Sequence, residues 1–83
     1  MSGEKDALSA AVGHEIRERR TAMRLSQEKL AEAAGLNQTS ISLLERGEHS
    51  PTLTTLESLA EALETTLTAL VACAEARVRR GRI

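Results

Sequence analysis

Hydrogen-bonding side chains near the middle of the chain are spaced for molecular recognition. Gln38, Thr39 and Ser42 follow one another within a short stretch, and Leu43 adjoins them. On a helix that advances about 100° per residue, these four side chains point toward the same side. The amide of Gln38 can form paired hydrogen bonds with the flat edge of a base, and its neighbours can contact adjoining edges or a methyl group. The chemistry that they indicate is base reading.

The chain lacks the side-chain combinations on which catalysis and metal binding depend. His14 and His49 are far apart, Cys73 is the single cysteine, and the carboxylates are scattered. No metal-ligand spacing, no nucleophile with a neighbouring base and no glycine-rich phosphate loop is present in the sequence. We therefore expect a protein that is not an enzyme and that needs no cofactor or metal.

Two short helices with clear start and stop signals surround the recognition side chains. Ser26 can cap a helix that runs to Ala34, and Gly35 can take the positive φ that ends it. Asn37 can cap a second helix that stops near Gly47. In this second helix Ser40, Ile41 and Leu44 face away from the recognition side chains, and in the first helix Leu30, Ala31 and Ala34 share a face. The small Ala31 lets the helices cross closely, as a helix-turn-helix requires.

The segment resembles a known family. Its pattern is a Leu25-Ser26-Gln27 opening, the small Ala31, Gly35 at the turn and a Glu45-Arg46-Gly47 close. It resembles the helix-turn-helix of the Cro and phage-repressor family, also called the XRE family, and the likeness extends from about residue 12 to residue 70. The resemblance implies an all-α fold, a compact five-helix lambda-repressor-like DNA-binding domain with the helix-turn-helix at helices 2 and 3.

Two positions depart from the family pattern. Relatives often carry glycine at two positions where this chain does not. One is the position before Leu25, which is Arg24 here, and the other is the position after the fourth helix, which is Glu64 here. If the backbone is left-handed there, each of these non-glycine residues lowers the stability of the fold by on the order of 1 kcal/mol.

The length of 83 residues predicts one domain, residues 1–83. We expect a polar tail at residues 1–6, a DNA-binding core at residues 7–66 and a fifth helix at residues 67–80 capped by Thr66. The first helix is predicted from Ala7 to Ala22, with Leu8 on its apolar stripe. Thr52 or Thr54 can cap the fourth helix, whose inner face is predicted to include Leu53.

The composition favours duplex DNA over single-stranded nucleic acid as the binding partner. Phe, Trp and Tyr are absent, and single-stranded nucleic acids are usually held by stacking on such rings. The net charge of −1 is unusual for a DNA-binding protein. Arg17, Arg19, Arg20 and Arg24 cluster, however, whereas residues 54–76 carry glutamates and no lysine or arginine. We expect the arginine-bearing end to face DNA.

The family resemblance suggests roles for further polar residues. Gln27 matches a phosphate-contacting position, and an Arg20–Glu45 ion pair is expected to brace the third helix on the first. The other predicted phosphate contacts are Arg24, Asn37, Ser40, Arg46 and His49. Capping alone also explains Asn37, and His14 is predicted to be a surface residue.

The fifth helix has an apolar stripe with two interpretations. Leu67, Leu70, Val71, Ala74 and Val78 recur at helical spacing. The stripe either completes the core of one chain or meets a second copy in a two-fold interface, and the second is favoured because a small bundle cannot hide five helices. Arg77, Arg79, Arg80 and Arg82 are expected to complement the helix C-terminus.

The sequence therefore predicts a homodimeric, sequence-specific regulator of transcription that binds double-stranded DNA at a palindromic operator. Restriction-modification controller proteins are the favoured setting, with phage-type repressors and antitoxins as alternatives. The rival is a protein-interaction module that keeps the fold and docks on a toxin or on RNA polymerase. The single cysteine and the absence of long apolar runs point to the cytoplasm and away from a membrane.

Overall fold

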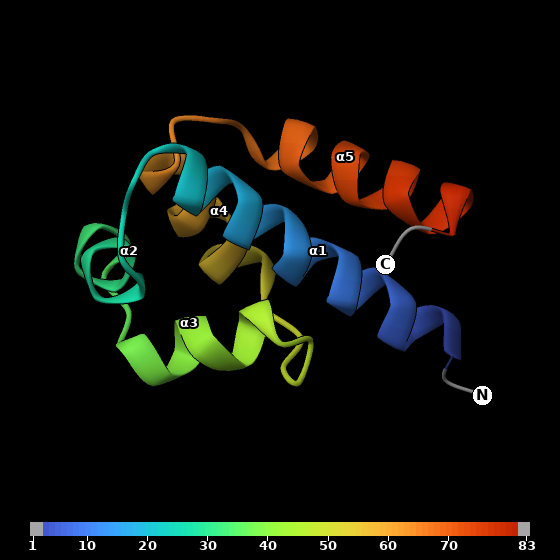
Figure 1. The fold of residues 1–83 in the computed structure, drawn as a ribbon, viewed down its shortest axis with the longest axis horizontal. Coiled ribbons are helices and arrows are strands. Elements are labelled where there is room, and N and C mark those ends of the chain that lie inside the picture. The colour runs from blue at the N-terminus through green and yellow to red at the C-terminus, as the bar shows by residue number, and fades with distance from the viewer. Residues whose placement is uncertain (1–2, 82–83) are drawn as a thin grey trace.

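The computed structural model describes the backbone of residues 3–81 and the side chains of residues 7–81. Over this range the chain forms five α-helices and no strand. The helices are α1 (Gly3–Ala22), α2 (Gln27–Ala34), α3 (Gln38–Glu45), α4 (Leu53–Ala62) and α5 (Leu67–Arg80). α1 is the central element, with α5 along one side of it, α3 along the other and α4 behind (Figure 1). The predicted all-α, five-helix fold is confirmed.

Each helix from α2 to α5 is preceded by a capping residue that the sequence analysis proposes. Ser26 accepts from the amide of Lys29 at 3.0 Å, and Asn37 accepts from that of Ser40 at 2.8 Å. Thr52 caps α4 and Thr66 caps α5 in the same way. Such bonds satisfy backbone donors that have no partner inside the helix. Thr52 is the cap of α4, and Thr54 lies inside that helix.

Side chains from all five helices form one core. Its largest fully buried members are Ile16, Leu30, Ile41, Leu59 and Leu70. Two of the predicted inward positions are wrong, because Leu53 is 70% exposed and Leu8 is 38% exposed. Leu53 is the first residue of α4 and lies outside the contact between α4 and the core. α1 also begins at Gly3, earlier than predicted; Met1 and Ser2 of the predicted tail lie outside the described residues, as do the side chains of residues 3–6.

A glycine sets the distance between α1 and α3. A Cβ atom on Gly13 would lie 1.9 Å from the carbonyl oxygen of Leu44 and 3.2 Å from the Cα atom of Glu45. Real Cβ atoms do not approach backbone atoms this closely, so only glycine permits the crossing. The position of α3 on the central helix thus depends on one missing side chain.

Two helix ends carry strained residues. Arg24 has φ 60° and Glu64 has φ 59°, both in the left-handed region. The amide of the following residue then bonds back into the helix, from Leu25 to Arg20 at 3.1 Å and from Thr65 to Ala60 at 2.9 Å. This pattern usually has glycine at the strained position. The structure therefore forms this turn at both positions without a glycine.

Candidate nucleic-acid interface

The helix pair α2 and α3 places the recognition side chains on the outside of the molecule. Gly35 ends α2 with φ 73°, and Asn37 starts α3 after a short turn. Ile41 and Leu44 are buried at 0% and 3% exposure and hold α3 against the core. Because these residues occupy the inner side of α3, the opposite side of the helix faces away from the core.

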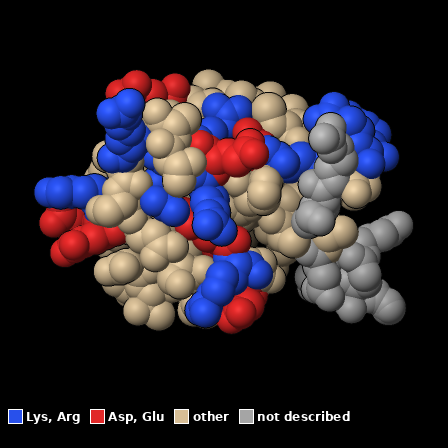
Figure 2. Space-filling model, in the orientation of Figure 1, with Lys and Arg blue, Asp and Glu red and all other residues tan. Residues whose placement is uncertain are grey.

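The outer side of α3 is polar and uncharged along its first turns. Gln38 and Thr39 are exposed, and Ser42 and Leu43 are partly exposed. Leu43 is not among the partly buried residues that pack against the core. The surface over the N-terminal half of α3 carries no basic or acidic side chain in Figure 2, while basic and acidic side chains together lie over α1 and beside the C-terminal end of α3. A neutral hydrogen-bonding surface with cations near its end suits contact with base edges between phosphates.

A buried ion pair fixes α3 to α1. The guanidinium of Arg20 donates to the two carboxylate oxygens of Glu45, with N···O distances of 2.6 and 3.0 Å. The side chains are 11% and 3% exposed, respectively. Arg20 also donates to the carbonyl oxygen of Leu25 at 2.8 Å, at the entry to α2. One side chain therefore connects the central helix with both parts of the helix-turn-helix.

Gln27 joins this cluster from the first position of α2. Its amide nitrogen donates to Oε1 of Glu45 at 3.1 Å. A side-chain amide nitrogen carries two hydrogens, so one remains for another acceptor. Gln27 is partly exposed beside the N-terminus of α2, where the backbone amides favour an anion. The bond to Glu45 orients the amide in the free protein.

The other residues expected near phosphates are spread over the ends of the helices. Arg24, Asn37, Arg46 and His49 are exposed, and Ser40 is partly buried. Asn37 uses its side-chain oxygen for the cap of α3, and Arg46 lies 3.8 Å from Glu48 in an exposed ion pair. His49 and Ser40 line the same small cavity, of about 130 Å³, between α3 and the start of α4.

The fifth helix turns part of its predicted interface inward. Leu70 and Ala74 are both 0% exposed within the single chain. They pack in the core and are unavailable to a second copy, which corrects the expectation for these two positions. Leu67, Val71 and Val78 are partly buried and keep some surface. The apolar stripe thus divides into an inner pair, Leu70 and Ala74, and an outer group, Leu67, Val71 and Val78.

Two arginines take roles that the sequence analysis does not anticipate. Arg19 points toward α5 and pairs with Glu15, so it does not belong to an arginine cluster directed at DNA. Arg77 lies in the last turn of α5 as expected, and it also pairs with Glu15 and Glu18 of α1. Arg82 lies outside the described residues. The i, i+4 spacing of Glu15 and Arg19 could have signalled an intrahelical pair, but no local pattern reveals the link to Arg77.

Comparison with known proteins shows to which family the chain belongs. The model of the helix-turn-helix family HTH_3 matches residues 16–70, which is more than half of the chain. The chain belongs to this family. It is a helix-turn-helix DNA-binding regulator, and the family is one of transcriptional regulators without enzyme activity. The matched range contains the caps, the turn and the polar outer side of α3.

Named relatives of this regulator include controller proteins. It is 46% identical over 56 residues to Control protein C.SmaI of Serratia marcescens, a match that covers 68% of this chain and 67% of the relative. The crystal structure of the restriction-modification controller protein C.AhdI from Aeromonas hydrophila superposes with a TM-score of 0.73 at 37% identity, covering 75% of this chain and 94% of that one. The clp gene regulator ClgR from Corynebacterium glutamicum superposes with a TM-score of 0.85 at 26% identity, covering 89% and 79%.

No helix in the described part of the regulator has the length and apolar composition to cross a bilayer.

Proposed function

We propose that this regulator controls a restriction-modification system by binding a palindromic operator as a homodimer. The observation that carries the proposal is the uncharged, hydrogen-bonding outer side of α3, which Ile41, Leu44 and the Arg20–Glu45 pair hold outward. The likeness to C.SmaI and C.AhdI favours the controller setting over a phage-type repressor or an antitoxin. Two α3 helices about 34 Å apart would read half-sites about 10 base pairs apart.

In this proposal Gln38 reads the operator. Its exposed amide makes paired hydrogen bonds with an adenine in the major groove. Thr39, Ser42 and Leu43 contact the neighbouring base edges or a thymine methyl group. These roles rest on the exposure of the four side chains along one arc of α3.

Phosphate contacts fix the register of α3 in the groove. Gln27 donates its remaining amide hydrogen to a phosphate beside the N-terminus of α2, while its other hydrogen stays on Glu45. The further phosphate contacts are Arg24, Asn37, Ser40, Arg46 and His49.

The dimer is assigned to the outer group of α5. Val71, Val78 and Leu67 keep apolar surface there, and Val78 lines a groove of about 270 Å³ with Leu8, Glu75 and Arg79. Glu75 and Arg79 have opposite charges one helical turn apart. In an antiparallel pair of α5 helices, Glu75 of each copy can therefore face Arg79 of the other, as a two-fold interface requires. We place this dimer in the cytoplasm, with the DNA.

A selection of bound sequences from a random duplex pool tests the operator. We expect an enriched palindrome whose half-sites contain A·T pairs, with affinity that falls linearly in log salt. Gln38→Ala should change the selected sequence, whereas Gln27→Ala should weaken all sequences alike. If no sequence is enriched and binding does not respond to salt, the proposal is refuted.

The alternative is a protein-interaction module that docks on a toxin or on RNA polymerase. The net charge of −1 favours it, because DNA-binding surfaces are usually basic. A flat salt response together with unaltered binding of the protein partner by Gln38→Ala would support this alternative.

A further inference from the structure

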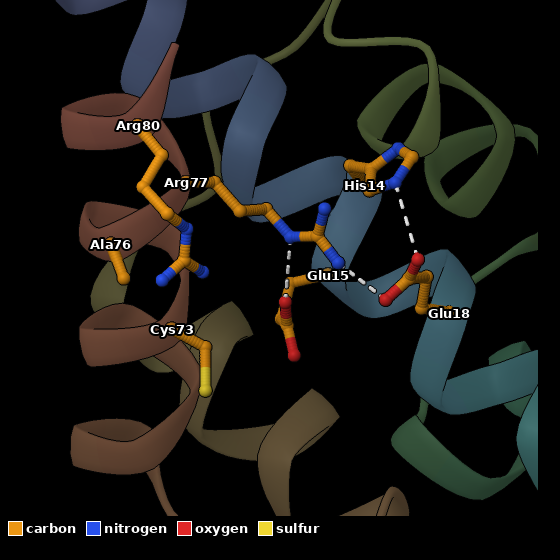
Figure 3. Close-up of a pocket in the computed structure, with 7 residues that line it drawn as sticks. All are labelled: His14, Glu15, Glu18, Cys73, Ala76, Arg77 and Arg80. Carbon is orange, nitrogen blue, oxygen red and sulfur yellow. Dashed lines mark hydrogen bonds and ion pairs between the residues drawn. The ribbon is translucent and has the colours of Figure 1, made fainter. Parts of the chain in front are cut away.

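A buried carboxylate lies between α1 and α5. Glu15 is 8% exposed. Each of its oxygens accepts from a different guanidinium: Oε2 from Nε of Arg19 at 2.9 Å, and Oε1 from Nε of Arg77 at 2.9 Å. Figure 3 shows Arg77 reaching from α5 to Glu15 across the space between the two helices. A buried charge with partners on two helices ties the helices at a defined position.

The network extends in both directions from this carboxylate. Arg19 donates to Oγ1 of Thr65 in the loop before α5 and to Sγ of Cys73 in α5, both at 3.3 Å. Arg77 donates to Glu18 as well. The hydrogen bond to Glu15 raises the pKa of Arg77 above its usual value. Polar bonds thus join α1 to the loop before α5 and to the middle and C-terminal half of α5.

Apolar packing holds α5 along only one part of its circumference. Leu70 and the small Ala74 are 0% exposed, and Leu67, Val71 and Val78 are partly buried against the same core. In a helical projection these five residues occupy one arc, with Leu70 at one edge and Val71 at the other, and Arg77 lies beyond Leu70. The bonds of Arg77 therefore hold the edge of α5 that the apolar contacts do not reach.

The two sides of α5 have different surfaces. On the Arg77 side lies a pocket of about 560 Å³ lined by Glu15, Glu18, Cys73, Arg80 and others (Figure 3). On the Val78 side lies the groove formed with Leu8, Glu75 and Arg79. The polar network occupies the first side, and the surface assigned above to the dimer occupies the second.

We propose that Arg77 is a positioning residue for dimerisation: by pairing with Glu15 it fixes the roll of α5 on α1 and so presents Val71 and Val78 to a second copy of this chain. The inference rests on the proposed homodimer. Loss of Arg77 leaves Leu70 and Ala74 in the core but lets α5 roll, so the outer groups of two copies no longer match. Reading of a single half-site by α3 is unaffected, because α3 packs on the opposite side of α1.

Sedimentation equilibrium of the full chain tests this inference. Arg77→Ala should raise the dimer dissociation constant at least about tenfold, a change of about 1.4 kcal/mol. Arg80→Ala is the matched control, because it removes the same charge from the same pocket without removing a bond to α1. Arg77→Lys keeps a cation that can reach Glu15 and should restore most of the dimer. Half-site DNA affinity should stay within about twofold in all three variants.

Thermal unfolding distinguishes a role of Arg77 in orienting α5 for the dimer from a role in stabilising the fold alone. If Arg77 only stabilises the fold, Arg77→Ala lowers Tm but leaves the dimer constant unchanged well below Tm, and the inference is overturned. Arg77→Met keeps the apolar stem of the side chain and replaces Arg77→Ala should the latter fail to fold. A parent chain that is monomeric at every concentration, with and without operator, overturns the proposed homodimer itself.

Discussion

Replacing Gly13 by alanine tests the contact between α1 and α3. The new methyl carbon would lie 1.9 Å from the carbonyl oxygen of Leu44 and 3.0 Å from its carbonyl carbon. Carbon and oxygen in close contact lie about 3.3 Å or more apart. The two helices would therefore have to separate by more than about 1 Å at this point.

The size of the effect follows from two opposing terms. Alanine stabilises a helix by about 1 kcal/mol relative to glycine. Overpacking a core typically costs about 1–3 kcal/mol and occasionally more, and here the obstacle is backbone, which cannot rotate away as a side chain can. We expect Gly13→Ala to be destabilised by about 2 kcal/mol net, which lowers Tm by roughly 8–16 °C in a domain of this size.

Thermal unfolding followed by circular dichroism measures this loss. Gly35→Ala is a suitable control, because its Cβ atom would meet nothing within 4 Å and only the φ of 73° is unfavourable. That control should lose about 1 kcal/mol. DNA binding should fall in Gly13→Ala even well below its Tm, since α3 is displaced from α1. A Gly13→Ala variant that melts at or above the parent temperature would show that the close helix crossing is absent.

Three further substitutions probe the site and the turns. Arg20→Ala should lose about 3 kcal/mol and most DNA binding, because it strands the buried carboxylate of Glu45; a variant that melts like the parent but binds poorly would show that the pair does not brace α3. Gln38→Ala should lose about 1–3 kcal/mol of discrimination at one base pair of each half-site, measured by competition with mutated operators, and should keep the parent Tm. An unchanged base preference would remove Gln38 from base reading. Glu64→Gly should raise stability by up to about 1 kcal/mol, seen as a higher urea midpoint, because it relieves the φ of 59°; a lower midpoint would mean that the entropy of the unfolded chain outweighs the strain.

Much of the fold is predictable because its signals are local. Ser26, Asn37 and Thr66 are capping residues that identify themselves by type and by the apolar pattern that follows. Each caps the helix expected of it. The buried sides of α2 and α3 likewise follow from helical periodicity, since Leu30 and Ile41 are fully buried.

Features that depend on tertiary packing are not predictable in this way. Periodicity places Leu53 on the inner side of α4, yet it is 70% exposed at the first position of the helix. It also treats Leu70 and Val71 as one stripe, whereas Leu70 is fully buried and Val71 is partly exposed. The link from Glu15 to Arg77 joins residues on different helices, so no spacing along the chain encodes it.

The position of the candidate site could be predicted, but its internal contacts could not. The outward exposure of Gln38 and Thr39 follows from the helical wheel. The bond from Gln27 to Glu45 does not, because it depends on where α2 crosses α3. Sequence reasoning also assigns no role to Gly13, although a glycine inside a helix can indicate close approach of another backbone.

We expect the pairing of its arginines to affect how this regulator searches a chromosome. Arg19, Arg20 and Arg77 are engaged with carboxylates of the same chain, and the N-terminal half of α3 is uncharged. These three cations are not free to neutralise phosphates, so we expect a weaker attraction to random duplex than unpaired arginines would give. Bulk chromosomal DNA would then sequester less of the protein. Occupancy of an operator would follow the rate of synthesis closely, which lets a small rise in copy number switch a promoter.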